Sequence, residues 1–282
     1  MKKRNGLIAM AAAAALFLAA CGGADSTDDS STMTESSSQT ETTNLLQQVQ
    51  DAGVIKVGLM GTYQPYNFLN ENQEMDGFDA DIAKEIAKGL GVDVEFVSQE
   101  FSGMIAGLKA NKFDMVVSQM TITEDRKKEM LFSDPYITNQ VKVIVSEGNT
   151  DILSVNDFPG KQIGVGLGTN DETYLRTVLM PEVGEFEIRT YDDVITSLKD
   201  LDAGRIDATI NNMYALKPVI ETNGFKIKAV GDAVKSDQAG IAVKLGNEAF
   251  IAEVNRILAE IKEDGTYRDI FVKWFGEEPP AE

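Results

Sequence analysis

Apolar residues recur along most of the chain either in short runs or at helical spacing. Short apolar runs predict β-strands at 54–60, 92–97, 113–117, 140–145, 161–166, 186–190, 206–210 and 240–243. Spacings of three and four residues predict a helix that begins at Asp79 as N-cap, with an apolar stripe from Ile82 to Leu90. The same spacing predicts further helices at 101–108, 171–179, 192–203, 213–221, 247–262 and 267–275. This alternation predicts an α/β fold with parallel sheets covered by helices.

Two internal similarities favour two lobes of similar plan over one large domain. The segment 110–114 ends in Asp114 and resembles 203–207, which ends in Asp207, and each leads from a helix into an apolar strand. A Gly-Thr pair follows a strand at 61–62 and again at 168–169. Two such lobes would form a cleft, because ligands of open α/β sheets bind outside the C-terminal ends of the strands. Chance similarity between short α/β units is the alternative.

The first 20 residues have the pattern of an export signal. A basic segment, 2–4, precedes an apolar run, 7–20, which is shorter than the roughly 20 residues of a membrane-spanning helix. The run ends in small residues directly before Cys21, and 18–22 resembles the lipobox of bacterial lipoproteins. Cys21 is the only cysteine, so we expect no disulfide and a lipid anchor there, with palmitate or a similar chain. A secretory signal with an incidental cysteine is the alternative.

The next segment, 21–44, is rich in Ser, Thr, Asp and Glu and predicts a disordered, flexible tether. The chain carries 26 basic and 45 acidic residues, a net charge of −19, which argues against a nucleic-acid partner. It contains no histidine, which argues against imidazole metal sites and histidine bases. We therefore expect no metal, no cofactor and no catalytic residue.

Several segments resemble, in the same order, motifs of family 3 of the bacterial extracellular solute-binding proteins, the polar amino-acid-binding components of ABC transporters. They are 77–84, 121–126, 132–136, 164–170, 204–208, 264–267 and 273–276, within a resemblance that runs from about residue 53 to 276. It implies a two-lobed, type II periplasmic-binding-protein-like fold in which the chain crosses between lobes near 139–143 and 236–240. Lobe 1 would comprise 45–140 plus 238–276, lobe 2 would comprise 143–236, and 277–282 would form a flexible tail.

The resemblance also implies which residues bind the ligand carboxylate. Arg126 matches the family's carboxylate-binding arginine, whose planar fork donates two parallel hydrogen bonds, and Thr121 matches a hydroxyl position beside it. A solvated arginine in a short helix capped by Thr123 is the alternative. Thr169 and Asn170 precede a predicted helix, where free N–H groups favour an anion, although simple N-capping by Asn170 is compatible. A phosphate loop is less favoured because the Gly-Lys-Ser/Thr pattern is missing.

Three aromatic residues are candidates for the walls around the ligand side chain: Tyr63, Tyr66 and Phe101. Tyr63 and Phe101 match positions at which the family encloses the aliphatic part of its ligand, although without that resemblance Phe101 would be interpreted as a core residue of its helix. Gln119 and the backbone near Met120 follow a predicted strand, where polar ligand contacts are expected.

The expected site for the ligand's amino group departs from the family pattern. Many relatives have an aspartate at the position of Asn212. An asparagine accepts a hydrogen bond from an ammonium group without contributing charge. Asp237 is a candidate replacement, with an ordinary surface aspartate as the alternative.

These residues predict the extracytoplasmic, lipid-anchored, monomeric binding protein of an amino-acid ABC importer, which would deliver its ligand to the permease subunits. The segments 165–170 and 212 look most similar to binders of cystine or neutral polar amino acids. The alternatives are a dehydratase-like enzyme on the same fold, for which no catalytic signature is visible, and a ligand sensor. Sensors of this type usually continue into a membrane helix, whereas this sequence ends at Glu282.

Overall fold

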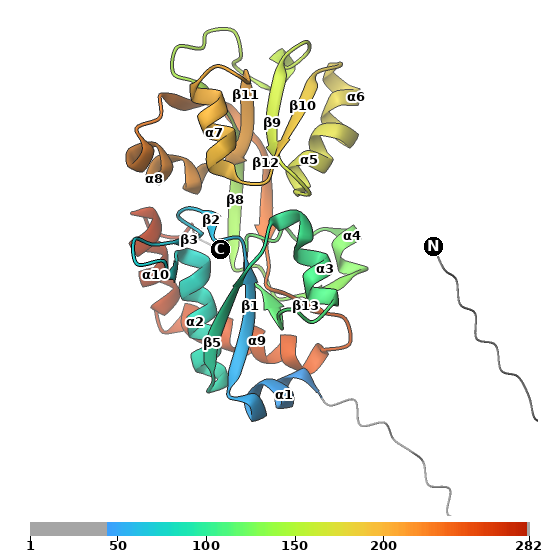
Figure 1. The fold of residues 1–282 in the computed structure, drawn as a ribbon, viewed down its shortest axis with the longest axis vertical. Coiled ribbons are helices and arrows are strands. Elements are labelled where there is room, and N and C mark those ends of the chain that lie inside the picture. Colours follow the sequence, from blue (N-terminus) through green and yellow to red (C-terminus); the bar gives the residue numbers. More distant parts are fainter. Residues whose placement is uncertain (1–43, 281–282) are drawn as a thin grey trace, which may run out of the picture. The chain divides into compact units, whose positions relative to one another are not determined.

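The computed structural model describes residues 44–280 (Figure 1). The predicted export signal, Cys21 and nearly all of the predicted tether lie outside the described residues. Between residues 44 and 280, no helix is both long and apolar enough to cross a bilayer.

The first sheet has the strand order β5-β1-β6-β13-β7. Its strands are β1 (Val54–Leu59), β5 (Asp93–Ser98), β6 (Met115–Val116), β7 (Met130–Phe132) and β13 (Ala242–Lys244). The helices of this lobe are α1 (Leu45–Ala52), α2 (Phe78–Leu90), α3 (Met104–Lys109), α4 (Glu124–Lys127), α9 (Glu248–Glu263) and α10 (Thr266–Phe275). Helices α2, α9 and α10 pack on the sheet through fully buried side chains such as Ile82, Phe250 and Phe271. We call this part lobe 1.

The second sheet has the order β10-β9-β11-β8-β12. Its strands are β8 (Ile137–Ser146), β9 (Gln162–Gly166), β10 (Glu187–Tyr191), β11 (Ala208–Asn212) and β12 (Ile227–Ala239). Its helices are α5 (Asn170–Tyr174), which continues through a π-helical turn (Leu175–Leu179) into α6 (Met180–Val183), α7 (Val194–Asp202) and α8 (Met213–Asn223). We call this part lobe 2. A small sheet of β2 (Thr62–Tyr63), β3 (Asn67–Leu69) and β4 (Met75–Asp76), with short 3₁₀ turns at Phe101–Gly103 and Val155–Asp157, completes the described elements.

The two large sheets share one plan, as the repeated segments suggested. Asp114 accepts a hydrogen bond from the backbone N–H of Lys56 at 2.8 Å, and Asp207 accepts one from Gln162 at 2.8 Å. Each aspartate thus ties the strand that follows it to the neighbouring parallel strand, which is β1 for Asp114 and β9 for Asp207. The expectation of parallel sheets was incomplete: β13 runs antiparallel to β6, and β8 runs antiparallel to β11, so both sheets are mixed.

Strands β8 and β12 connect the lobes. They pair antiparallel along most of their length, from Ile227 opposite Ser146 to Ala239 opposite Ile137, with an irregularity between Val230 and Lys235. At the lobe 1 end, Ala239 forms a bridge with Thr121. Figure 1 shows the pair running from the sheet of lobe 2 toward lobe 1. The lobe boundaries inferred from the sequence stay a prediction.

Three local expectations need correction. Asp79 is not the N-cap of α2: Gly77 holds that position at φ 120°, and the Asp79 side chain turns into the protein interior. Asn170 does not cap α5 either, because Thr169 accepts the hydrogen bond from the backbone of Glu172. The strand expected at 206–210 lies two residues further on, so Asn211 and Asn212 end β11. Thr123 caps α4, as expected.

Candidate functional site

One cavity is lined by residues of both lobes. Lobe 1 contributes Met60, Tyr63, Phe101, Ser118, Gln119 and Thr121, and lobe 2 contributes the turn after β9, the segment 191–194, the end of β11, and Asp237. Eight residues singled out in the sequence line it: Tyr63, Phe101, Gln119, Thr121, Thr169, Asn170, Asn212 and Asp237. The C-terminal ends of β9 and β11 therefore meet those of lobe 1, as open α/β sheets require for a ligand site.

Arg126 lies beside this cavity rather than among the residues that line it. Its guanidinium donates to the carbonyl of Thr121 at 2.9 Å and, across the lobes, to the carbonyl of Gly168 at 3.3 Å. It also lies over the Phe101 ring, 5.5 Å from the ring centroid. Burial lowers the pKa of Arg126, while the charges of Asp171 and Asp237 act in the opposite direction. Arg126 is only 9 % exposed. The negative charges of Asp171 and Asp237 in lobe 2 therefore favour its charged form across the space between the lobes.

The turn after β9 brings the lobes close together. Gly168 has φ 74°, and a Cβ there would lie 2.9 Å from the Cα of Ser102 in lobe 1, so only glycine fits this approach. Thr169 donates to the carbonyl of Gly166 at 2.7 Å, and Asn170 donates from its side chain to Asp237 at 3.2 Å. The Tyr63 hydroxyl adds a second direct bond between the lobes, to Oδ1 of Asn211 at 2.5 Å.

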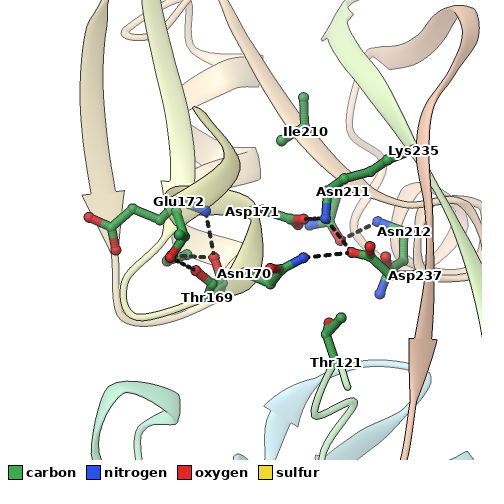
Figure 2. A network of polar contacts seen from close by, with 12 residues as sticks. Thr121, Thr169, Asn170, Asp171, Glu172, Ile210, Asn211, Asn212, Lys235 and Asp237 are labelled. Atoms are coloured by element: carbon green, nitrogen blue, oxygen red, sulfur yellow. Dashed lines mark hydrogen bonds and ion pairs between the residues drawn. The ribbon is translucent and has the colours of Figure 1, made fainter. Parts of the chain in front are cut away.

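A cluster of charged groups borders the cavity in lobe 2 (Figure 2). Lys235 contacts Oδ1 of Asp171 at 2.7 Å and also pairs with Asp237, and both carboxylates line the cavity. Burial raises the pKa of Asp171, and the nearby Lys235 opposes that effect. Burial also disfavours the charged form of Lys235, but the two aspartates outweigh it and raise its pKa. Asn212 lines the cavity close to this cluster.

Sequence reasoning missed Asp171, Asn211 and Lys235. Asp171 directly follows two residues that were singled out, so its position was the available signal. No local pattern marks Lys235, because its partners come from the turn after β9 and from its own strand. Asp237, the candidate replacement for the missing aspartate, does line the cavity.

Beneath the cavity floor lies a buried network centred on Asp79. Its carboxylate accepts hydrogen bonds from the side chains of Asn67 at 2.7 Å, Gln119 at 2.6 Å and Tyr136 at 2.9 Å. Burial raises the pKa of Asp79 to about 7, although these three donors lower it. Oε1 of Gln119 accepts from Asn139 at 2.8 Å, so both ends of the Gln119 amide are engaged, one by Asp79 and the other by Asn139 of β8.

Two other sequence candidates lie away from the cavity surface. Tyr66 is fully buried, and its ring packs at a tilt against that of Tyr63, with the ring centroids 4.9 Å apart. Its hydroxyl donates to Asn139 at 2.8 Å, which ties the aromatic wall to β8. Met120 is buried in the core of lobe 1, and its carbonyl accepts from the backbone of Gly240 at 3.1 Å. Among the described residues, no group of acidic or cysteine side chains could hold a metal ion.

The fold and this inter-lobe cavity define a two-lobed binding protein. Residues 55–277 match the family model of the bacterial extracellular solute-binding proteins, family 3, so the chain belongs to that family. The match agrees with the resemblance found in the sequence motifs. The matched family and the relatives are binding proteins, which favours binding over the catalytic alternative.

Individual relatives cover most of the described chain. This chain is 37 % identical to the L-cystine-binding protein TcyJ of Escherichia coli K12 over 233 aligned residues. The aligned region covers 82 % of this chain and 86 % of that protein. A solved ancestral arginine-binding protein bound to arginine is 38 % identical with a TM-score of 0.75, over 79 % of this chain and 99 % of that one. A putative L-cystine ABC transporter from Listeria monocytogenes is 28 % identical with a TM-score of 0.76, over 80 % and 98 %.

Proposed function

We propose that this chain captures a neutral polar amino acid, with cystine favoured, and delivers it to the permease of an ABC importer. The family assignment supports an extracytoplasmic binding role, and the similarity to a cystine-binding protein supports the ligand class. The chain would act as a monomer that docks on the permease subunits.

The single observation that carries this proposal is the meeting of opposite charges from the two lobes at one cavity. Arg126 belongs to lobe 1, whereas Asp171 and Asp237 belong to lobe 2 and line the cavity that Thr121 also borders. A free amino acid presents one carboxylate and one ammonium group, and it therefore needs a site of each sign. Arg126 would take the carboxylate, assisted by Thr121, Thr169 and Asn170. The acidic residues would take the ammonium group, with Asn212 as a neutral acceptor beside them.

The remaining wall suits the apolar part of a ligand. Tyr63 and Phe101 line the cavity from lobe 1, and Phe101 is held in place by the guanidinium above it. A ligand that contacts both lobes stabilises the closed arrangement over an open one, because its contacts exist only when the lobes meet. The permease would then recognise the closed form.

Mass spectrometry of the small molecule released on unfolding the purified protein tests this proposal. We expect the released molecule to be a neutral amino acid, and specifically cystine or a related disulfide-linked amino acid. Recovery of a ligand that carries no carboxylate would contradict the assigned site.

Replacing Tyr63 by phenylalanine should weaken ligand binding by about 5-fold, because it removes one hydrogen bond, worth about 1 kcal/mol, that forms only between closed lobes. Titration calorimetry measures the change. Tyr191→Phe is the matched control: Tyr191 also lines the cavity, but its hydroxyl donates to Asp200 within lobe 2 at 2.9 Å. Equal losses in both variants would contradict a closure role for Tyr63.

The lipid anchor is a further part of the proposal and rests on the sequence around Cys21. Cys21→Ser should release the protein from the membrane fraction into the soluble extracytoplasmic fraction, because no acyl chain can then attach. Fractionation followed by immunoblotting measures this, with Ser30→Ala as a control within the predicted tether. Unchanged membrane association of the serine variant would contradict anchoring at Cys21.

A further inference from the structure

Lys235 is a cation that lies directly behind the wall of the ligand cavity. Its side chain is 14 % exposed and is held between the carboxylates of Asp171, 20 % exposed, and Asp237, 14 % exposed. Lys235 is not among the residues that line the cavity, whereas both aspartates are. Figure 2 shows Lys235 reaching from β12 to Asp171 and Asp237, with Asn170 donating to Asp237 from the other side.

The elements that meet here explain why the cluster forms. Lys235 lies where β12 resumes its pairing with β8 after the irregularity at 230–235, opposite Val141. Asp171 lies in the first turn of α5, directly after the turn that approaches lobe 1. Asp237 is two residues beyond Lys235 on the same face of β12, because successive side chains of a strand alternate. The ring of Tyr174, 5.6 Å from the Lys235 ammonium, adds a cation–π contact on a further side.

Four of the charged groups around the cavity balance one another. Arg126 and Lys235 contribute two positive charges, and Asp171 and Asp237 contribute two negative ones, so this set is neutral. Two more aspartates line the cavity. Asp193 caps α7 and accepts from the backbone and the hydroxyl of Thr196, both at 2.7 Å, and Asp192 is exposed, so solvent and local donors screen both.

A neutral set of charges matches an amino acid without a charged side chain. Its carboxylate would pair with Arg126, and its ammonium would pair with the one net negative charge of the Asp171–Lys235–Asp237 cluster. An arginine or lysine ligand brings an additional positive charge into a cavity where Lys235 already neutralises one carboxylate. Such juxtaposed like charges are unfavourable in a partly buried site.

We infer that Lys235 determines ligand specificity: it sets the charge of the cavity to match a neutral amino acid and excludes ligands with a cationic side chain. This inference rests on the proposed function and names a residue that acts through Asp171 and Asp237. The family fold accommodates both kinds of ligand, since the relatives include a cystine-binding protein and an arginine-binding one. The choice between them must therefore come from the residues around the cavity.

The test compares Lys235→Met with the unchanged protein by titration calorimetry against cystine, the neutral amino acids, arginine, lysine and ornithine. Methionine keeps the length of the side chain and removes its charge. We expect the ratio of the arginine dissociation constant to that of the best neutral ligand to fall by about 100-fold or more, since a freed carboxylate becomes available to the ligand cation. Lys235→Arg keeps the charge and should keep the preference for neutral ligands.

Two control variants show whether the effect of Lys235→Met comes from the local charge balance. The first excludes an effect of side-chain shape, and the second excludes an effect of the net charge of the whole protein. Lys235→Met combined with Asp237→Asn restores the balance of the set and should return the preference for neutral ligands. Lys142→Met removes the same charge from the neighbouring strand β8, where Lys142 donates to the carbonyl of Gly231 on the exposed surface, and should leave the preference unchanged.

The outcomes distinguish this inference from the proposed function. Tight binding of arginine by the unchanged protein would overturn the role of Lys235 and the neutral ligand class, but not the capture of an amino acid. A folded Lys235→Met variant that still prefers neutral ligands would overturn the role of Lys235 and leave the proposed function standing. A variant that melts earlier but keeps its ligand order would assign Lys235 a purely structural role and would equally overturn it. If the unchanged protein binds no amino acid of either class, the proposed function fails and the inference fails with it.

Discussion

Replacing Arg126 by alanine should lower the affinity for the amino acid by about 1,000-fold or more, because two parallel charge-assisted hydrogen bonds to the ligand carboxylate, together about 4 kcal/mol, are lost. The loss should appear for every ligand that the protein binds, since each carries the same carboxylate. Titration calorimetry of the variant measures it.

Two controls accompany this variant. Arg126→Lys keeps the positive charge but not the planar fork, so it should bind with intermediate affinity. Arg256→Ala removes an exposed arginine of α9 that pairs with Glu253 and Glu260, and it should bind normally. Undiminished affinity of folded Arg126→Ala would refute the assigned carboxylate site.

Replacing Asp79 by asparagine should lower the free energy of unfolding by about 3 kcal/mol, because the buried network offers only donors to this position. The asparagine NH₂ group would face either Asn67 or Gln119, both of which already donate there. Reversing Gln119 would in turn leave Asn139 facing another donor. For a domain of this size, the loss corresponds to a melting temperature lower by about 6–12 °C.

Thermal denaturation without ligand measures this effect. Asp125→Asn is the matched control, because Asp125 is exposed on α4 and pairs only with Lys128 among the described contacts, so its melting temperature should stay unchanged. A melting temperature of Asp79→Asn equal to that of the unchanged protein would show that the network relaxes without loss.

The regular elements of the fold could be predicted because their apolar positions follow a strict period. The stripe from Ile82 to Leu90 predicted α2, and the buried run of β9 predicted a strand, since burial on one face or on both imposes these patterns. Strand β12 was missed because it follows no such pattern: Gly231 interrupts it, its pairing shifts between Val230 and Lys235, and much of it is exposed.

The site could be predicted only in part, for a related reason. Ordered motifs located Arg126, Thr121 and Thr169 in the sequence, and the structure brings these segments together at one cavity. Asp79 was misassigned because an aspartate before an apolar run looks like an N-cap, whereas its true partners, Gln119 and Tyr136, lie far along the chain. Lys235 gave no signal for the same reason, since only the tertiary fold places it beside Asp171.

Titration calorimetry of the purified, ligand-free protein against cystine and each of the common amino acids tests the binding function most directly. We predict saturable binding of cystine or another neutral polar amino acid at one site per chain, and much weaker binding of arginine and lysine. Absence of binding for every amino acid in the panel would contradict that function.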